Sequence, residues 1–190
     1  MGKIKVVLAE DHALMRDAVR LVDAVRFGKL DAAIAAVERS KNSMKRYVAA
    51  ATAAGIAPDA PARRLAKIEE QQLDGLLLLK RGRTSEGMAL LSEAAAGERA
   101  SPMEFGPPSL DKPANELLGE VLLEQGRAKE ACVAFESAQT LAPGRGQSLI
   151  GLSKCARQLG NAEVADNADA RLARVRLREA LASYITPAAR

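Results

Sequence analysis

The stretch Asn115–Pro143, NELLGEVLLEQGRAKEACVAFESAQTLAP, decides the fold of this chain. Its first half places leucine and valine at helical spacing up to Gly126, and its second half places small and aromatic residues at that spacing up to Pro143. Glycine suits the left-handed turn that ends a helix, and proline cannot continue one. The stretch therefore predicts two antiparallel helices joined at Gly126, with Gly119 and Ala131 at their closest approach.

A weaker copy of this pattern follows after 34 residues. Leu152, Ala156, Gly160 and Ala165 follow Leu118, Leu122, Gly126 and Ala131 at that interval. Asp169 stands where the first copy has Phe135, which suits the last unit of an array because no further unit covers it. A fixed period of this length is typical of stacked helix pairs, which serve as binding scaffolds far more often than as catalysts.

Upstream, the same pattern recurs at a longer interval of 44 residues. Gly75, Leu78 and Gly82 precede Gly119, Leu122 and Gly126, and Gly87 and Leu91 precede Ala131 and Phe135, by that number. We assign the roughly ten extra residues to a connector over 97–112. A fainter fourth pair surrounds Gly28, and its second helix either runs on through 43–54 or breaks and restarts there.

With these residues in place, the chain resembles the tetratricopeptide repeat family. The family signature falls on eight structural positions, which are Leu118, Gly119, Leu122, Gly126, Ala131, Phe135, Ala138 and Pro143. The resemblance implies an all-α fold in which antiparallel helix pairs stack as a short right-handed solenoid. We therefore expect a helical repeat domain over 17–178, with pairs at about 17–54, 61–97, 113–142 and 147–174, and a helical extension and tail over 175–190.

The family fold also implies a concave groove lined by the first helix of each pair. Its candidate partner-binding residues here are Gln72, Leu76, Leu79, Glu116, Glu120, Leu123, Glu124, Ile150, Lys154 and Arg157. Glu116, Glu120 and Glu124 recur every four residues and so share one helix face. One interpretation is a charge-patterned, partly apolar groove for a protein or peptide. The other is that these are ordinary solvated faces and that the chain covers the apolar positions itself.

Residues 1–16 differ from the rest of the chain. Lys3 to Ala9 is a β-type run followed by the acidic pair Glu10-Asp11, which resembles the opening of a bacterial response-regulator receiver domain, where such a pair holds Mg²⁺. Asp59 lies at about the distance of the phosphorylated aspartate, but no strand precedes it and no later β-type run follows, so the receiver chemistry is absent. Three interpretations stay open: a fusion remnant, which we favour, an orphan β-strand at residues 3–9 that pairs with another chain, or a segment drawn into the first helix.

Composition argues against most catalytic and membrane functions. Of 190 residues, 48% are hydrophobic but only 3% are aromatic, so the core must be built from alanine and leucine. His12 is the single histidine, and we expect no enzyme, no metal and no cofactor. No apolar run is long enough for a membrane span. The net charge is +4, with its densest patch in the arginines of 171–178, and we do not expect a nucleic-acid partner.

The two cysteines, Cys132 and Cys155, are too few and too far apart for a disulfide framework. We therefore expect buried thiols and a cytoplasmic location in a bacterial-type protein, bearing in mind that a replaced N-terminus would have removed any targeting signal. The leading hypothesis is a non-enzymatic scaffold that binds a protein or peptide on its concave face, with no oligomeric state favoured. The alternative is a signalling protein whose receiver-like segment contributes to phosphorelay or strand-mediated association.

Overall fold

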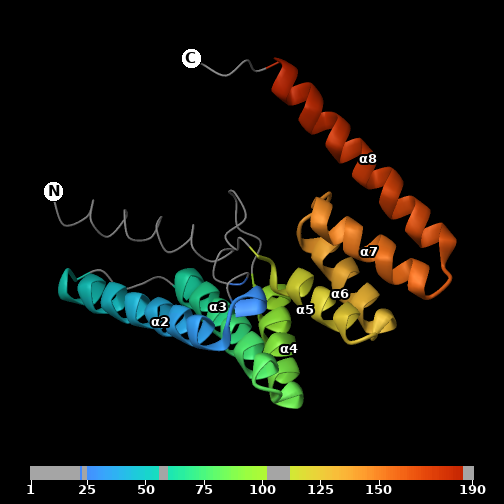
Figure 1. Ribbon diagram of the computed structural model, residues 1–190. Coiled ribbons are helices and arrows are strands. Elements are labelled where there is room, and N and C mark those ends of the chain that lie inside the picture. Colours follow the sequence, from blue (N-terminus) through green and yellow to red (C-terminus); the bar gives the residue numbers. More distant parts are fainter. Residues whose placement is uncertain (1–21, 23–24, 56–59, 102–111, 186–190) are drawn as a thin grey trace. The chain divides into compact units, whose positions relative to one another are not determined.

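Helices make up the secondary structure of every described segment of the chain. The computed structural model describes residues 22, 25–55, 60–101 and 112–185. The labelled helices are α2 (Leu30–Ala53), α3 (Ala60–Lys80), α4 (Thr84–Ala100), α5 (Ala114–Glu124), α6 (Ala128–Leu141), α7 (Gly146–Gln158) and α8 (Ala162–Ile185) (Figure 1). No strand occurs within these residues, so the all-α prediction is confirmed. The strand expected at residues 3–9 lies outside them.

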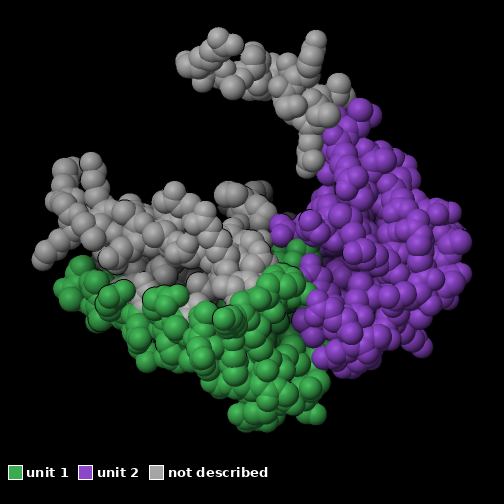
Figure 2. Space-filling model, in the orientation of Figure 1, with its two compact units in different colours: residues 1–117 green, residues 118–190 purple. Residues whose placement is uncertain are grey.

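The chain divides into two compact units, residues 1–117 and 118–190 (Figure 2). The boundary falls within α5, so the first turn of that helix belongs to unit 1 and the remainder to unit 2. Within unit 1, α3 packs against α2 and α4, and within unit 2, α7 packs against α6 and α8, as neighbouring helices do in a helical solenoid (Figure 1). The three-part division expected from the sequence, at residues 1–16, 17–178 and 175–190, stays a prediction.

Three glycine turns join consecutive helices in the same way. Gly82, Gly126 and Gly160 have φ values of 78°, 73° and 71°. The amide of the following residue donates to the carbonyl five residues earlier, from Arg83 to Leu78, Arg127 to Leu122 and Asn161 to Ala156, each at 2.9 Å. This is the Schellman arrangement, which satisfies the last carbonyls of a helix and needs a residue at positive φ. The turns predicted at these glycines are confirmed.

The helix after each turn also begins in a repeated way. Arg83 donates from Nε and Nη2 to the two carboxylate oxygens of Glu86, and Arg127 does the same to Glu130. Each carboxylate lies in the first turn of its helix, where it complements the positive end of the helix dipole. At the third turn Asn161 takes the arginine position, and its Oδ1 accepts from the amide of Val164 at 3.2 Å.

In unit 1, α3 and α4 approach each other through glycines. A Cβ on Gly75 would lie 3.0 Å from the carbonyl oxygen of Gly87 and 3.0 Å from Cγ of Leu91. A Cβ on Gly87 would lie 2.7 Å from the carbonyl oxygen of Gly75. The two backbones are therefore too close for any side chain at the crossing. The glycines matched by the 44-residue interval are the ones that touch.

The helices differ from the sequence expectations mainly in length. α2 runs unbroken from Leu30 to Ala53, which decides between the two alternatives for the faint first pair. α4 extends to Ala100, so the first residues of the predicted connector are helical. In the buried part of unit 1, Val25, Ala33 and Val37 are at most 1% exposed, as the helical spacing around Gly28 predicts.

Unit 2 is organised around the ring of Phe135, which is fully buried. A Cβ on Gly119 of α5 would lie 2.9 Å from its Cε1. A Cβ on Gly151 of α7 would overlap the same ring, with even Cε2 only 2.6 Å away. Phe135 therefore fills the space between α5 and α7, and both helices need glycine where they face it. Leu91 contacts Gly75 in the same way in unit 1.

Candidate interaction surface

The ten predicted groove residues separate into a buried set and an accessible set. Gln72, Leu76 and Glu116 are only 3%, 4% and 0% exposed. Half-buried positions are Leu79, Glu120, Leu123 and Ile150, and exposed positions are Glu124, Lys154 and Arg157. The three buried residues correct the predicted groove, because a partner cannot contact them unless neighbouring side chains move away.

Glu116 and Gln72 are buried because they bind the segment that leads into α5. The Glu116 carboxylate pairs with Nζ of Lys112 at 3.2 Å, and Nε2 of Gln72 donates to the Lys112 carbonyl at 2.9 Å. The predicted acidic face of α5 is therefore not three equivalent surface carboxylates. Only Glu120 and Glu124 keep side chains that a partner could reach.

Asn115 joins α4 to the beginning of α5 and is fully buried. Its backbone amide and Nδ2 donate to Oε2 of Glu98 at 2.8 and 2.6 Å, and Nδ2 also donates to the Ala95 carbonyl at 3.1 Å. Its Oδ1 accepts from Nη1 of Arg99 at 2.6 Å. Glu98 thereby places a carboxylate at the amino end of α5, where the helix dipole favours it. Sequence reasoning missed this cluster, whose only signal was an asparagine in the first turn of a predicted helix.

Arg157 is exposed but is held within unit 2. It donates from Nη2 to the Asp169 carboxylate on α8 at 2.5 Å and from Nη1 to Oγ of Ser153. Asp169 stands in the last repeat where the preceding repeat has Phe135. Its carboxylate is paired with Arg157 of α7, the helix before it. This arrangement fits a terminal unit, and it commits one of the two predicted groove cations to an intramolecular ion pair.

The Arg157–Asp169 pair makes a testable electrostatic prediction. Hydrogen bonds from Arg157 and then Ser153 hold the pKa of the Asp169 carboxyl below its ordinary value of 3.8. A carboxyl whose folded pKa is depressed stabilises the fold above its unfolded pKa, and that contribution is lost as the pH falls below 3.8. We expect Arg157→Gln to raise the Asp169 pKa toward the ordinary value in a carboxyl-carbon NMR titration. An unchanged titration midpoint would show that the pair does not form in solution.

Gln139 connects α8 to the turn between α6 and α7. Its Nε2 donates to the Arg145 carbonyl at 2.9 Å, while its Oε1 accepts from the Gly144 amide at 3.1 Å and from Nη2 of Arg171 at 2.7 Å. Gln139 is 6% exposed, so these bonds replace water around a buried amide. Arg171, the first arginine of the basic cluster at 171–178, thus has a structural partner.

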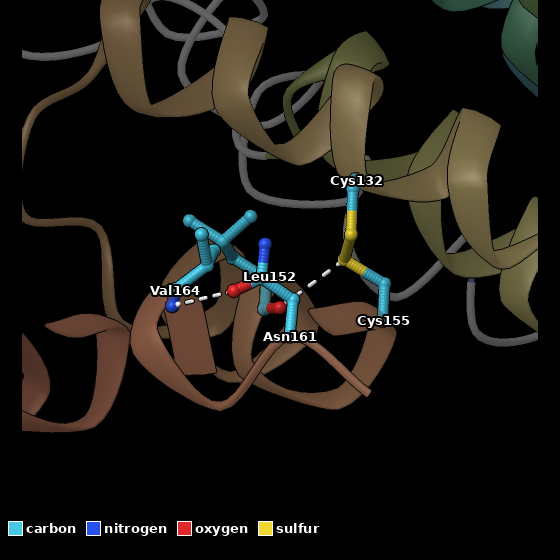
Figure 3. Close-up of a disulfide and its surroundings, with 5 residues drawn as sticks. All are labelled: Cys132, Leu152, Cys155, Asn161 and Val164. Carbon is cyan, nitrogen blue, oxygen red and sulfur yellow. Dashed lines mark hydrogen bonds between the residues drawn. A yellow bond between two sulfur atoms is a disulfide. The ribbon is translucent and has the colours of Figure 1, made fainter. Parts of the chain in front are cut away.

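Cys132 of α6 and Cys155 of α7 form a disulfide, with their Cα atoms 5.6 Å apart (Figure 3). The prediction of buried thiols is therefore wrong. The two cysteines are 23 residues apart in the sequence, but α6 and α7 run antiparallel on either side of the turn at Gly144, which brings them opposite each other. The cytoplasmic location loses its support from free thiols and stays a prediction.

The described part of the chain offers no other site with an evident chemistry. Within it, no three His, Cys, Asp or Glu side chains come together in a way that could hold a metal ion. None of its helices is long and apolar enough to cross a membrane. The receiver-like pair Glu10-Asp11, together with His12 and Asp59, lies outside the described residues.

Comparison with known proteins adds little. No protein-family model and no curated protein matches the chain. Among solved structures, the chain is similar to a mutant form of MamA, with 17% sequence identity over 87% of this chain and 98% of that chain, and a TM-score of 0.34. A likeness this weak supports no inference, so the fold rests on the helix pairs themselves and the function on the surface described above.

Proposed function

We propose that the chain is a non-enzymatic, tetratricopeptide-like scaffold that binds a protein or peptide through the first helices of its pairs. The observation that carries the proposal is what is left of the predicted groove in unit 2. Once the buried positions and Arg157, which pairs with Asp169, are set aside, five accessible positions remain on the first helices of unit 2: Glu120, Leu123 and Glu124 on α5, and Ile150 and Lys154 on α7. We call these five residues the α5–α7 face.

The α5–α7 face combines two features that suit a protein ligand. Leu123 and Ile150 are half-buried apolar side chains, which give up further apolar area when a partner covers them. Carboxylates stand on α5 and an amine stands on α7, so charges of both signs accompany the apolar positions. Such a pattern favours partners with the complementary arrangement and penalises others by like-charge contacts.

The perturbed ionisable groups of the described residues give no positive sign of acid–base catalysis. Every resolved pKa shift among the described residues belongs to a member of an ion pair within the fold, as in Arg83–Glu86, Arg127–Glu130 and Arg157–Asp169. Structural ion pairs perturb pKa values as active sites do, so these shifts by themselves identify no acid–base site. These pairs are explained by helix ends and helix contacts alone.

Charge reversal on the α5–α7 face tests the proposal. We expect Glu124→Lys combined with Lys154→Glu to weaken capture of the partner by at least about 10-fold, because two favourable contacts become repulsive. Partners are first recovered with the unmodified chain, identified by mass spectrometry and then titrated in purified form. Glu116 is left intact, since replacing a buried, paired carboxylate would test folding instead of binding.

A matched control reverses two charges on α6, which is the second helix of its pair. Lys129 and Glu136 are exposed on α6, so Lys129→Glu combined with Glu136→Lys makes the same change in charge away from the α5–α7 face. We expect this control to bind the partner as the unmodified chain does. Equal binding by both double variants, or equal loss in both, would contradict a role for the α5–α7 face.

A further inference from the structure

The Cys132–Cys155 disulfide joins two successive helix pairs. α6 is the second helix of one pair and α7 is the first helix of the next, so the bond spans the interface between repeats. It lies close along both helices to the contact between Phe135 and Gly151, three residues after Cys132 and four before Cys155. One covalent and one packing contact thus fix the same crossing of α6 and α7.

The surroundings of the two sulfur atoms protect the bond from reduction. Cys155 is fully buried, whereas Cys132 is half-buried, so Cys132 is the more accessible residue and we expect an incoming thiolate to attack its Sγ and expel Cys155 as the leaving group. Sγ of Cys155 lies 3.1 Å from the Leu152 carbonyl oxygen (Figure 3). Burial and a nearby carbonyl oxygen both disfavour a thiolate at this position. In the folded unit, a thiolate that attacks Sγ of Cys132 must therefore displace Cys155, which is a poor leaving group.

We propose that the oxidised chain is the working form of this protein, with Cys132–Cys155 as a structural cross-link between repeats that is shielded while unit 2 stays folded. Forming the bond removes two protons and two electrons from the cysteine thiols. A disulfide donor accepts them and is released as two thiols. Such donors act in oxidising compartments, where structural disulfides persist. The inference is independent of the proposed partner-binding role.

The redox state of the natural protein is tested by trapping. Cells that make the chain are quenched in acid, and the protein is denatured and treated with iodoacetamide before any reductant is added. We expect an intact mass without added label, and two labels only after reduction. A chain that takes up two labels without reduction would overturn the proposal that the oxidised form is the working one.

Shielding is tested with the purified full-length chain. A dithiol reductant attacks Cys132, forms a mixed disulfide, releases Cys155 as a thiol after protonation and then closes its own ring to release Cys132. We expect this reduction to be at least about 100-fold slower under native conditions than in concentrated urea, because Cys132 is half-buried and the leaving group, Cys155, is fully buried in the folded unit. Equal rates in the two conditions would overturn the shielding.

Stability gives a third, separate measurement. A cross-link that closes a loop of this size restricts the unfolded chain, so the reduced protein is expected to melt about 10–20 °C lower than the oxidised protein. The double variant Cys132→Ala with Cys155→Ala should melt like the reduced chain, and reductant should not change it. If the double variant does not fold, the reduced unmodified chain still gives the comparison. Melting temperatures within about 2 °C of each other would overturn the structural role.

Discussion

Replacing Gly151 with alanine is expected to destabilise unit 2 by about 3 kcal/mol, one of the largest effects available in the chain. The added methyl group would overlap the ring of Phe135, which is fully buried between α5 and α7. The ring has little room to move aside, because it also packs so closely against α5 that a Cβ on Gly119 would lie 2.9 Å from its Cε1. The penalty exceeds the roughly 1 kcal/mol that alanine gains over glycine inside a helix. Urea unfolding followed by circular dichroism measures the loss.

Two further variants separate this clash from a general effect of removing glycine. Gly146 lies in the same helix, and a Cβ there would meet Cδ1 of Leu172 at 3.4 Å, an ordinary contact. Gly146→Ala should therefore stay within about 0.5 kcal/mol of the unmodified chain. Phe135→Leu introduced with Gly151→Ala should cost less than the sum of the two single changes, since the smaller side chain leaves room for the methyl group. Additive losses would refute the proposed contact.

The contrast between Gly126 and Gly151 shows what local sequence could predict. Gly126 ends a helix in a turn whose hydrogen bonds are local, so its role follows from neighbouring residues, and the predicted turn is confirmed. Gly151 is required only because Phe135, on another helix, packs against it. The 34-residue interval places Ser153 opposite Gly119 in the pattern, and so it misses the glycine that the ring contacts.

The predicted groove shows the limit of projecting side chains from a single helix. Spacing by four correctly places Glu116 and Glu120 on neighbouring turns of α5. It carries no information about Lys112, which precedes the helix and buries the Glu116 carboxylate in an ion pair. Exposure depends on segments that cover a helix, and those are not encoded in the periodicity of the helix itself. The binding role of the remaining positions stays a prediction.

The prediction of buried thiols at Cys132 and Cys155 was wrong for a related reason. A separation of 23 residues argues against a disulfide only if the chain between them is extended or runs in one direction. Here two helices and one turn at Gly144 occupy that interval, and antiparallel packing brings residues equally far from the turn close together. The repeat pattern already implied antiparallel neighbours, so measuring each cysteine from the turn would have found the pair.

Asn115→Ala is expected to destabilise unit 1 by about 3 kcal/mol. The substitution removes the side chain that donates to Glu98 and Ala95 and accepts from Arg99, all at a position with no exposure. At present no buried side-chain nitrogen or oxygen in the described residues lacks a hydrogen-bond partner. After the substitution the Ala95 carbonyl loses a donor without gaining water, which is the costly case for a buried polar group. Urea unfolding of the full chain measures the effect.

A control and a double variant test whether the loss comes from this cluster. Asn42 is exposed on α2 in the same unit, so Asn42→Ala should change the free energy of unfolding by no more than about 0.5 kcal/mol. Glu98→Ala alone should also be costly, because Glu98 accepts from the Asn115 backbone amide and side chain. The combined variant should lose about 1–2 kcal/mol less than the two single losses added together, since each change removes the same hydrogen bond. Strict additivity would mean that Asn115 and Glu98 act independently, and α5 would then not owe its start to the Glu98 carboxylate.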